Sequence, residues 1–200
     1  ATVELKERIV LPCIQDAVDD ALELRQAGGH LEWMVLDISD AFHNIPLRPT
    51  ERRFACGKVG NRYVVFEVLC MGGKSAPNVW GRYSSGLGRV MASLFDPLEF
   101  RNEVYVDDPL MGAVGTEHER DVTFTIALLA LQTTGFPLAW NKGVVGSSVI
   151  WIGAQLTVLP HSIEVTVPED KLDALQDLSA DIRKTVVTDR RLISCLLYTS

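Results

Sequence analysis

Three aspartates carry the clearest chemical signal in this sequence. Asp107 and Asp108 are adjacent in the stretch "EVYVDDPLMG", where apolar residues flank them on both sides, and Asp37 ends the earlier apolar run "MVLD". Apolar runs of this kind usually form buried strands, in which an unpaired carboxylate is costly. A partner of opposite charge, or an exposed turn, is therefore needed to accommodate these acids.

A divalent cation would meet that need. If the strand that ends in Asp37 lies beside a hairpin that carries Asp107 and Asp108 at its turn, the three carboxylates converge. Mg²⁺ prefers such hard oxygen ligands and keeps positions for water and phosphate oxygens. Two such ions can activate an attacking oxygen and stabilise a leaving oxygen at phosphorus. The acids thus predict phosphoryl transfer, with an Asp-rich turn and a helix N-cap at Asp37 as the alternatives.

The bulk composition is that of a globular protein. The chain has 200 residues, of which 47% are hydrophobic and 22% charged, enough for one large core or two modest lobes. No apolar run approaches the roughly 18 residues of a spanning helix, and "ATVELKERIV" at the start lacks the order of a signal peptide. The cysteines show no C-x-x-C spacing, which favours reduced thiols. The histidines show no H-x-x-x-H spacing, which favours surface or structural histidines over metal ligands. We therefore expect an intracellular protein of the cytoplasm or nucleus without a membrane partner.

The charge balance is acidic overall and basic in one segment. The formal net charge of −7 argues mildly against a nucleic-acid partner, because phosphate contacts need a basic surface. A local basic strip can nevertheless coexist with acidic helices elsewhere. The most basic stretch is "LRPTERRFACGKVGNR", which sets Arg48, Arg52, Arg53, Lys58 and Arg62 against Glu51.

The order of the expected elements predicts an α+β fold, because strands and long helices follow one another without regular alternation. Apolar residues at helical spacing predict a helix over 11–27, which Gly28 and Gly29 end. A capping box from Thr116 to Glu119 predicts the start of another helix. The other expected elements are strands over 32–38, 53–59 and 62–69, a helix over 75–95, a hairpin around the paired acids, strands within 136–158 and 163–167, a helix over 168–184 and the start of one more near 188.

Five segments, taken in order, resemble the motifs of retroelement reverse transcriptases of the long-terminal-repeat and retrovirus type. Each motif alone is weak, but their order and spacing together are specific. They are "LDISDAF" (36–42), "LCMGGKSAPNVWGR" (69–82), "YVDD" (105–108), "TTGFPLAWNK" (133–142) and "WIGAQL" (151–156), and "RIVLPCIQDAVDDAL" resembles the segment that precedes the first motif.

The resemblance implies the palm of a right-hand polymerase, which is an antiparallel sheet backed by helices. Residues 13–44 and 76–166 would form this palm, and residues 1–12 and 45–75 would form part of the fingers. Residues 167–200 would begin a truncated thumb. The chain would then be part of a longer polyprotein, and the fragment alone need not be active.

The implied function is that of an RNA-directed DNA polymerase. Its partners would be an RNA or DNA template with a primer and deoxynucleoside triphosphates, and its cofactors two Mg²⁺ ions, with Mn²⁺ as a substitute. The alternatives are a catalytically inactive relic that at most binds nucleic acid, a two-metal nuclease that uses the same acids, and a nucleic-acid-binding scaffold. Primer extension, primer degradation and magnesium-independent binding would separate them.

The resemblance also assigns the catalytic residues. Asp37, Asp107 and Asp108 would ligate the metal ions, and the backbone around Ile38 would complete a metal shell. Lys142 would donate a proton to the departing pyrophosphate or support it electrostatically, with a solvated surface lysine as the alternative.

A second group of residues would bind the incoming nucleotide. Asp40 and Ala41 would present backbone N–H groups to the triphosphate, and the ring of Phe42 would leave no room for a 2′-hydroxyl. Met71 and Gly72 would line the pocket, where Gly72 lets the backbone approach closely.

The primer strand would be held farther along the chain. Trp151 and Gly153 occupy the primer-grip motif, whereas Trp80 and Trp140 are expected to be packing residues. Pro109 departs from a plain strand pattern because it follows the acids directly and lacks an N–H donor.

Overall fold

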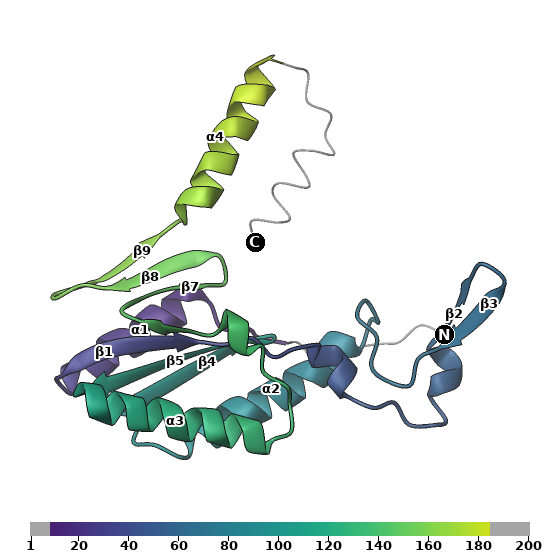
Figure 1. Cartoon of the computed structure of the whole chain (residues 1–200), viewed down its shortest axis with the longest axis horizontal. Helices are drawn as coiled ribbons and strands as arrows, with labels where there is room; N and C mark the ends of the chain where they lie inside the picture. The colour runs from purple at the N-terminus through teal and green to yellow at the C-terminus, as the bar shows by residue number, and fades with distance from the viewer. Residues whose placement is uncertain (1–8, 185–200) are drawn as a thin grey trace.

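The computed structural model describes residues 9–184, and Figure 1 shows the arrangement of their elements. The predicted ends of the fingers and thumb segments, residues 1–8 and 185–200, lie outside the described residues, as does the further helix expected near 188. The α+β class is confirmed, because residues 9–184 form four α-helices and three antiparallel sheets in an irregular order.

A four-stranded antiparallel sheet forms the centre of the molecule. Its spatial order is β4-β5-β1-β6, so that the hairpin of the paired acids lies directly beside the strand that leads to Asp37. The strands are β1 (His30–Val35), β4 (Phe100–Tyr105), β5 (Asp108–Gly115) and β6 (Val144–Gly146).

The two faces of this sheet belong to two hydrophobic cores, because successive side chains of a strand point to opposite faces. Met34 and Met111 pack into one core, whereas their neighbours Trp33 and Leu110 pack into the other. The first core is covered by α2 (Ala76–Ala92) and α3 (Glu117–Thr133), and the second by α1 (Ile14–Gln26) and by the strands β7 (Ser148–Trp151) and β8 (Ala154–Val158).

The long helices follow the predicted signals closely. The Thr116 hydroxyl accepts a hydrogen bond from the Glu119 N–H at 3.3 Å, and the Glu119 carboxylate accepts one from the Thr116 N–H at 2.8 Å, which confirms the capping box. Pro77 lies in the first turn of α2, where a missing N–H costs little. Helix α1 begins three residues later and ends one residue earlier than the predicted 11–27, and α2 begins one residue later and ends three residues earlier than the predicted 75–95.

The smaller elements extend away from the central sheet. The hairpin of β2 (Cys56–Val59) and β3 (Arg62–Val65) stands apart in Figure 1, and every residue of both strands is exposed. The strand predicted to start at residue 53 starts later because Arg52–Phe54 form a 3₁₀ turn. The remaining elements are 3₁₀ helices at Ala41–Asn44 and Trp140–Lys142, strand β9 (Ile163–Thr166) beside β8, and α4 (Glu169–Lys184), which projects from the body.

The helices and the cysteines of residues 9–184 bear on the expectations about membrane spans and thiols. No helix in this range is both long and apolar enough to cross a bilayer. Cys13, Cys56 and Cys70 are free thiols there, and Cys195 lies outside the range.

An acidic pair joins α1 to the central sheet. Glu103 on β4 and Asp20 on α1 share a side-chain hydrogen bond, and burial raises the pKa of both carboxyl groups, that of Glu103 to about 7. Nearby negative charge from Asp16 adds to this effect, whereas Arg101, which pairs with Glu23 at 2.5 Å, opposes it at Asp20. The contact between α1 and β4 therefore favours a bound proton.

We expect this pair to make folding pH-dependent. Because the Glu103 pKa is higher in the folded chain than its ordinary value of 4.5, its contribution is fully present below pH ~4.5 and is lost as the pH rises to about 7. Glu103→Gln should remove this loss, so that at pH 8 the variant is more stable than the wild type by about 1–2 kcal/mol, after allowance for solvent screening. Urea unfolding between pH 4 and pH 8 measures the difference.

Glu99→Gln, an exposed neighbour, is the matched control and should follow the wild-type curve. Equal pH dependence in Glu103→Gln and wild type would contradict the shared-proton explanation.

Candidate active site

The backbone brings the three predicted acids to one edge of the central sheet. After β1 ends, the chain continues alongside the hairpin, where the Leu36 N–H donates to the Pro109 carbonyl at 3.1 Å and the Ile38 N–H to the Asp107 carbonyl at 3.0 Å. Asp37 lies between these two bonds and is therefore held beside the paired acids.

The hairpin turn is tighter than the sequence indicated. Tyr105 pairs with Asp108, so the two turn residues are Val106 and Asp107. Asp108 is thus the first residue of β5, and the expectation that both acids lie at the turn is wrong for Asp108. Val106 has a φ of +54°, which is unusual for a β-branched residue and marks local strain.

Two buried tryptophans hold this strained turn from opposite faces of the sheet. The Trp80 indole N–H, from α2, donates to the Val106 carbonyl at 2.7 Å. The Trp151 indole N–H, from β7, donates to the Asp108 carbonyl at 3.0 Å. Each tryptophan is only 1% exposed, and the two belong to different cores. The peptide group before Asp107 and the one after Asp108 are therefore fixed.

Neither tryptophan role was deduced from the sequence. The sequence predicts only packing for Trp80 and a primer contact for Trp151. The side chain of Trp151 is buried beneath the hairpin, and its contact with the primer stays a prediction. The sequence offers only a general indication of these hydrogen bonds, because a buried indole N–H usually needs an acceptor and a tight turn offers carbonyl groups. Gly153 lies in the β7–β8 turn with a φ of +86°.

Lys142 reaches the acids from a neighbouring segment. The Ser39 N–H donates to the Pro137 carbonyl at 2.8 Å and the Ala139 N–H to the Asp37 carbonyl at 2.9 Å, so the chain leading to Lys142 is tied to the chain around Asp37. The Lys142 ammonium forms an ion pair and a hydrogen bond with an Asp37 carboxylate oxygen. Lys142 is thus paired with Asp37 while its side chain is 64% exposed, and its catalytic role stays a prediction.

The four ionisable groups influence one another. Burial raises the pKa of Asp107, and the Asp37 charge raises it further. Burial, followed by the charges of Asp107 and Asp37, raises the pKa of Asp108 to about 6. Lys142 partly offsets both effects, and its own pKa is raised by the hydrogen bond to Asp37. The acids are thus under-neutralised by the single lysine.

The donor set suits a divalent cation in its chemistry. Asp37, Asp107 and Asp108 supply hard carboxylate oxygens, and their mutual repulsion favours added positive charge. Within residues 9–184, no three His, Cys, Asp or Glu side chains are grouped closely enough to hold an ion in the arrangement described here. The Lys142 ammonium is the cation that contacts Asp37.

A cavity of about 420 Å³ opens at this edge. It unites many of the predicted residues and adds four that were missed, Ser39, His43, Ala139 and Asn141, which only their neighbourhood to the motifs could have indicated. Asp108, Gly72, Trp151 and Gly153 do not line it. The predicted residues in its wall are Asp37, Ile38, Asp40, Ala41, Phe42, Met71, Asp107 and Lys142.

The nucleotide-side residues form one short segment of the cavity wall. Asp40 has a φ of +50° and directly precedes the 3₁₀ helix Ala41–Asn44, whose first N–H groups have no partner inside the helix. The Phe42 ring is partly buried, and its centroid is 6.2 Å from that of Trp80. Phe42 is therefore supported from behind by the same indole that holds the hairpin.

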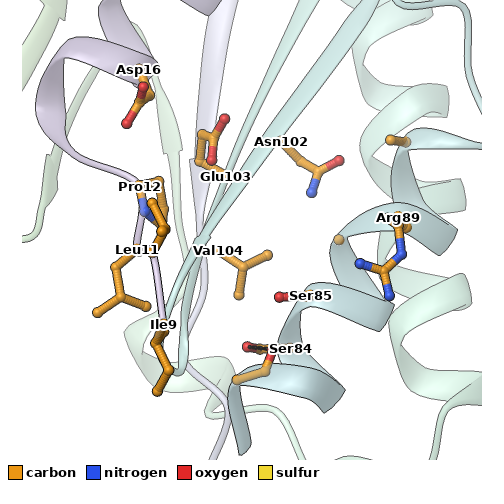
Figure 2. A pocket seen from close by; sticks show the side chains of 14 residues that line it. Ile9, Leu11, Pro12, Asp16, Ser84, Ser85, Arg89, Asn102, Glu103 and Val104 are labelled. Atoms are coloured by element: carbon orange, nitrogen blue, oxygen red, sulfur yellow. Dashed lines mark hydrogen bonds between the residues drawn. The ribbon is translucent and has the colours of Figure 1, made fainter. Parts of the chain in front are cut away.

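A second cavity of about 470 Å³ lies elsewhere, between residues 9–12, α2 and β4 (Figure 2). Asp16 and Glu103 line one side of it and Arg89 the other. None of the predicted site residues contributes to it. We assign the chemistry to the smaller of these two cavities, because only that one is lined by Asp37, Asp107 and Lys142.

No protein-family model matches the sequence. Among solved structures, the fold is similar to that of a foamy viral protease-reverse transcriptase in complex with dsDNA, with a TM-score of 0.63 and 15% identity over 98% of this chain and 36% of that one. A foamy viral protease-reverse transcriptase in complex with an RNA/DNA hybrid gives a TM-score of 0.58 and 15% identity over 72% of this chain and 18% of that one.

A third similar structure, the dRH form of this foamy viral protein with ds DNA, gives a TM-score of 0.58 and 16% identity over 72% of this chain and 24% of that one. The chain thus spans at most 36% of the length of these three proteins. At the level of the fold the resemblance seen in the motifs is confirmed, and the chain has a reverse-transcriptase-like fold.

Proposed function

We propose that this chain is the catalytic part of an RNA-directed DNA polymerase, which adds deoxynucleotides to a primer 3′-hydroxyl on an RNA or DNA template. One observation carries the proposal. Asp37, Asp107 and Lys142 line a single cavity at the sheet edge, and it also contains Phe42. Acids for metal ions, a cation for the leaving group and a ring beside the sugar are the groups that nucleotidyl transfer needs.

Asp37, Asp107 and Asp108, with the backbone at Ile38, would hold two Mg²⁺ ions. The ions, when bound, supply Lewis-acid activation of the primer hydroxyl and charge stabilisation of the leaving oxygen. The protein's part is to keep the acids in place. The bonds from Leu36 and Ile38 fix Asp37, and the two indole N–H groups fix the turn that carries Asp107.

The remaining cavity residues orient the nucleotide. The N–H groups of Asp40 and Ala41 would bind phosphate oxygens, and Met71 would lie along the nucleotide together with Gly72, which follows it in the chain just outside the cavity wall. Lys142 would donate a proton from Nζ to the departing pyrophosphate as the bond to the α-phosphorus breaks. The template and primer would lie across the same edge of the sheet. The β7–β8 turn, which contains Gly153 and follows Trp151, would contact the primer strand.

The central test is primer extension with Mg²⁺, carried out in the full-length protein that contains this chain. Asp107→Asn should reduce extension by about 10³-fold or more, because it removes a charged ligand from the reacting centre. Asp96→Asn, an exposed acid away from the cavity, is the control. Extension by Asp107→Asn at the wild-type rate would refute the mechanism, and degradation of the primer without incorporation would instead indicate a nuclease.

Phe42 should determine the choice of sugar. Phe42→Ala opens space beside the 2′ position, so discrimination against ribonucleotides should fall at least about tenfold, measured as the ratio of kcat/KM for the two nucleotides. Phe54→Ala, an aromatic residue that is 75% exposed and outside the cavity, should leave that ratio unchanged. An unchanged ratio in Phe42→Ala would remove this residue from the selection step.

Trp80 should affect both stability and turnover. Trp80→Phe leaves the Val106 carbonyl without its donor and should lower the free energy of unfolding by about 2 kcal/mol. Extension should fall mainly in kcat, because the turn that carries Asp107 loses support. Trp140→Phe, at a residue that is 56% exposed, should change stability by less than about 0.5 kcal/mol. Equal effects of the two variants would contradict the role of the indole N–H.

A further inference from the structure

The Lys142 ammonium occupies the place where positive charge is most needed at the candidate site. It contacts an Asp37 carboxylate oxygen directly and interacts electrostatically with Asp107 and Asp108. An opposite charge within a few ångströms of a carboxylate favours its ionised form. Lys142 therefore provides part of the positive charge that the three acids require.

The contact is built into the fold rather than formed by a chance side-chain conformation. Ile38 and Leu138 form an isolated antiparallel bridge, and the bonds at Ser39 and Ala139 continue it on either side. Lys142 ends the 3₁₀ helix that follows this bridge, and its N–H donates to the Ala139 carbonyl at 2.9 Å. The backbone beneath Lys142 is thus fixed relative to Asp37.

The two partners differ in how freely they can move. The Asp37 side chain is 17% exposed, whereas that of Lys142 is 64% exposed and lies at the wall of the open cavity. Breaking the pair therefore requires only that the lysine side chain swing into solvent on its fixed backbone. Asp37 stays in place, with one oxygen freed for another cation.

We propose that Lys142 is the resident counter-ion of the acid cluster, and that a divalent cation must displace it from Asp37 in order to bind. The proposal rests on the proposed function only for the identity of the cation. It makes Lys142 an autoinhibitory contact as well as a positioning residue, because the proton donor is held on Asp37 until the metal binds. Metal binding and release of the donor are then a single exchange.

The exchange adds a cost to metal binding. With Lys142 in place, one carboxylate oxygen of Asp37 is engaged. Metal affinity must then include the cost of breaking the ion pair. Removing the lysine charge should therefore strengthen binding, whereas removal of a metal ligand would weaken it.

The test is Mn²⁺ binding to the full-length protein without nucleotide or template, followed by electron paramagnetic resonance. Lys142→Met keeps the side-chain stem but removes the charge, and we expect Mn²⁺ to bind at least about fivefold more tightly than to the wild type. Lys58→Met, on the exposed β2–β3 hairpin, should bind as the wild type does. Adding Asp107→Asn to Lys142→Met should reverse the gain, which locates the ion at the acids.

A second readout follows the lysine itself. In the wild type without metal, acetylation of Lys142 by an amine-reactive reagent should be slower than that of Lys58, because the paired ammonium is a poor nucleophile. Mg²⁺ should speed the reaction at Lys142 severalfold and leave Lys58 unchanged. Peptide mass spectrometry measures both sites in the same sample.

Equal or weaker Mn²⁺ binding by Lys142→Met would overturn the proposal, as would no Mn²⁺ binding by either protein. Metal-independent acetylation of Lys142 would also overturn it. These outcomes are distinct from a failure of the proposed function. A protein that does not extend primers can still show the exchange, and a protein that extends them can lack it.

Discussion

Placing like charges at the edge of an apolar sheet is the constraint on which the rest of this structure depends. Two of the three acids lie partly buried on one hairpin, and burial together with mutual repulsion raises their pKa values. The fold accommodates this in two ways, with a fixed backbone around Asp37 and a lysine brought in from a separate segment. The pairing of β1 with β5, and the backbone bonds from residues 38 and 39 to the chain that leads to Lys142, bring these segments together.

Both hydrophobic cores contribute to that edge. Helix α2 covers one face of the sheet and supplies Trp80, while β7 covers the other and supplies Trp151. Each indole buries a large apolar surface and uses its one polar atom to hold a carbonyl of the hairpin. Stability and site geometry are therefore coupled, since loosening either core would release a peptide group next to the Asp107–Asp108 pair.

The sequence predicted the elements that have strong local signals, such as the capping box at Thr116 and the adjacency of Asp37 to the paired acids. It did not reveal that Asp108 starts β5, because the limits of a tight turn depend on strand pairing. The Lys142–Asp37 contact was also out of reach, since it joins segments that only the folded chain brings together. The sequence thus indicated which residues could form a site, whereas the contacts between distant segments became apparent only in the folded chain.

Pro109 illustrates how one missing hydrogen-bond donor can specify the alignment of two strands. It directly precedes Leu110, the last β5 residue paired with β1, and it lies opposite Leu36 beyond the end of that ladder. A slip of one residue would exchange the two faces of β5. A slip of two keeps the faces but places Pro109 opposite Met34, inside the ladder, where prolines are disfavoured because they lack an N–H donor. The position of the proline beyond the end of the ladder thus fits the register that keeps Asp37 beside the paired acids.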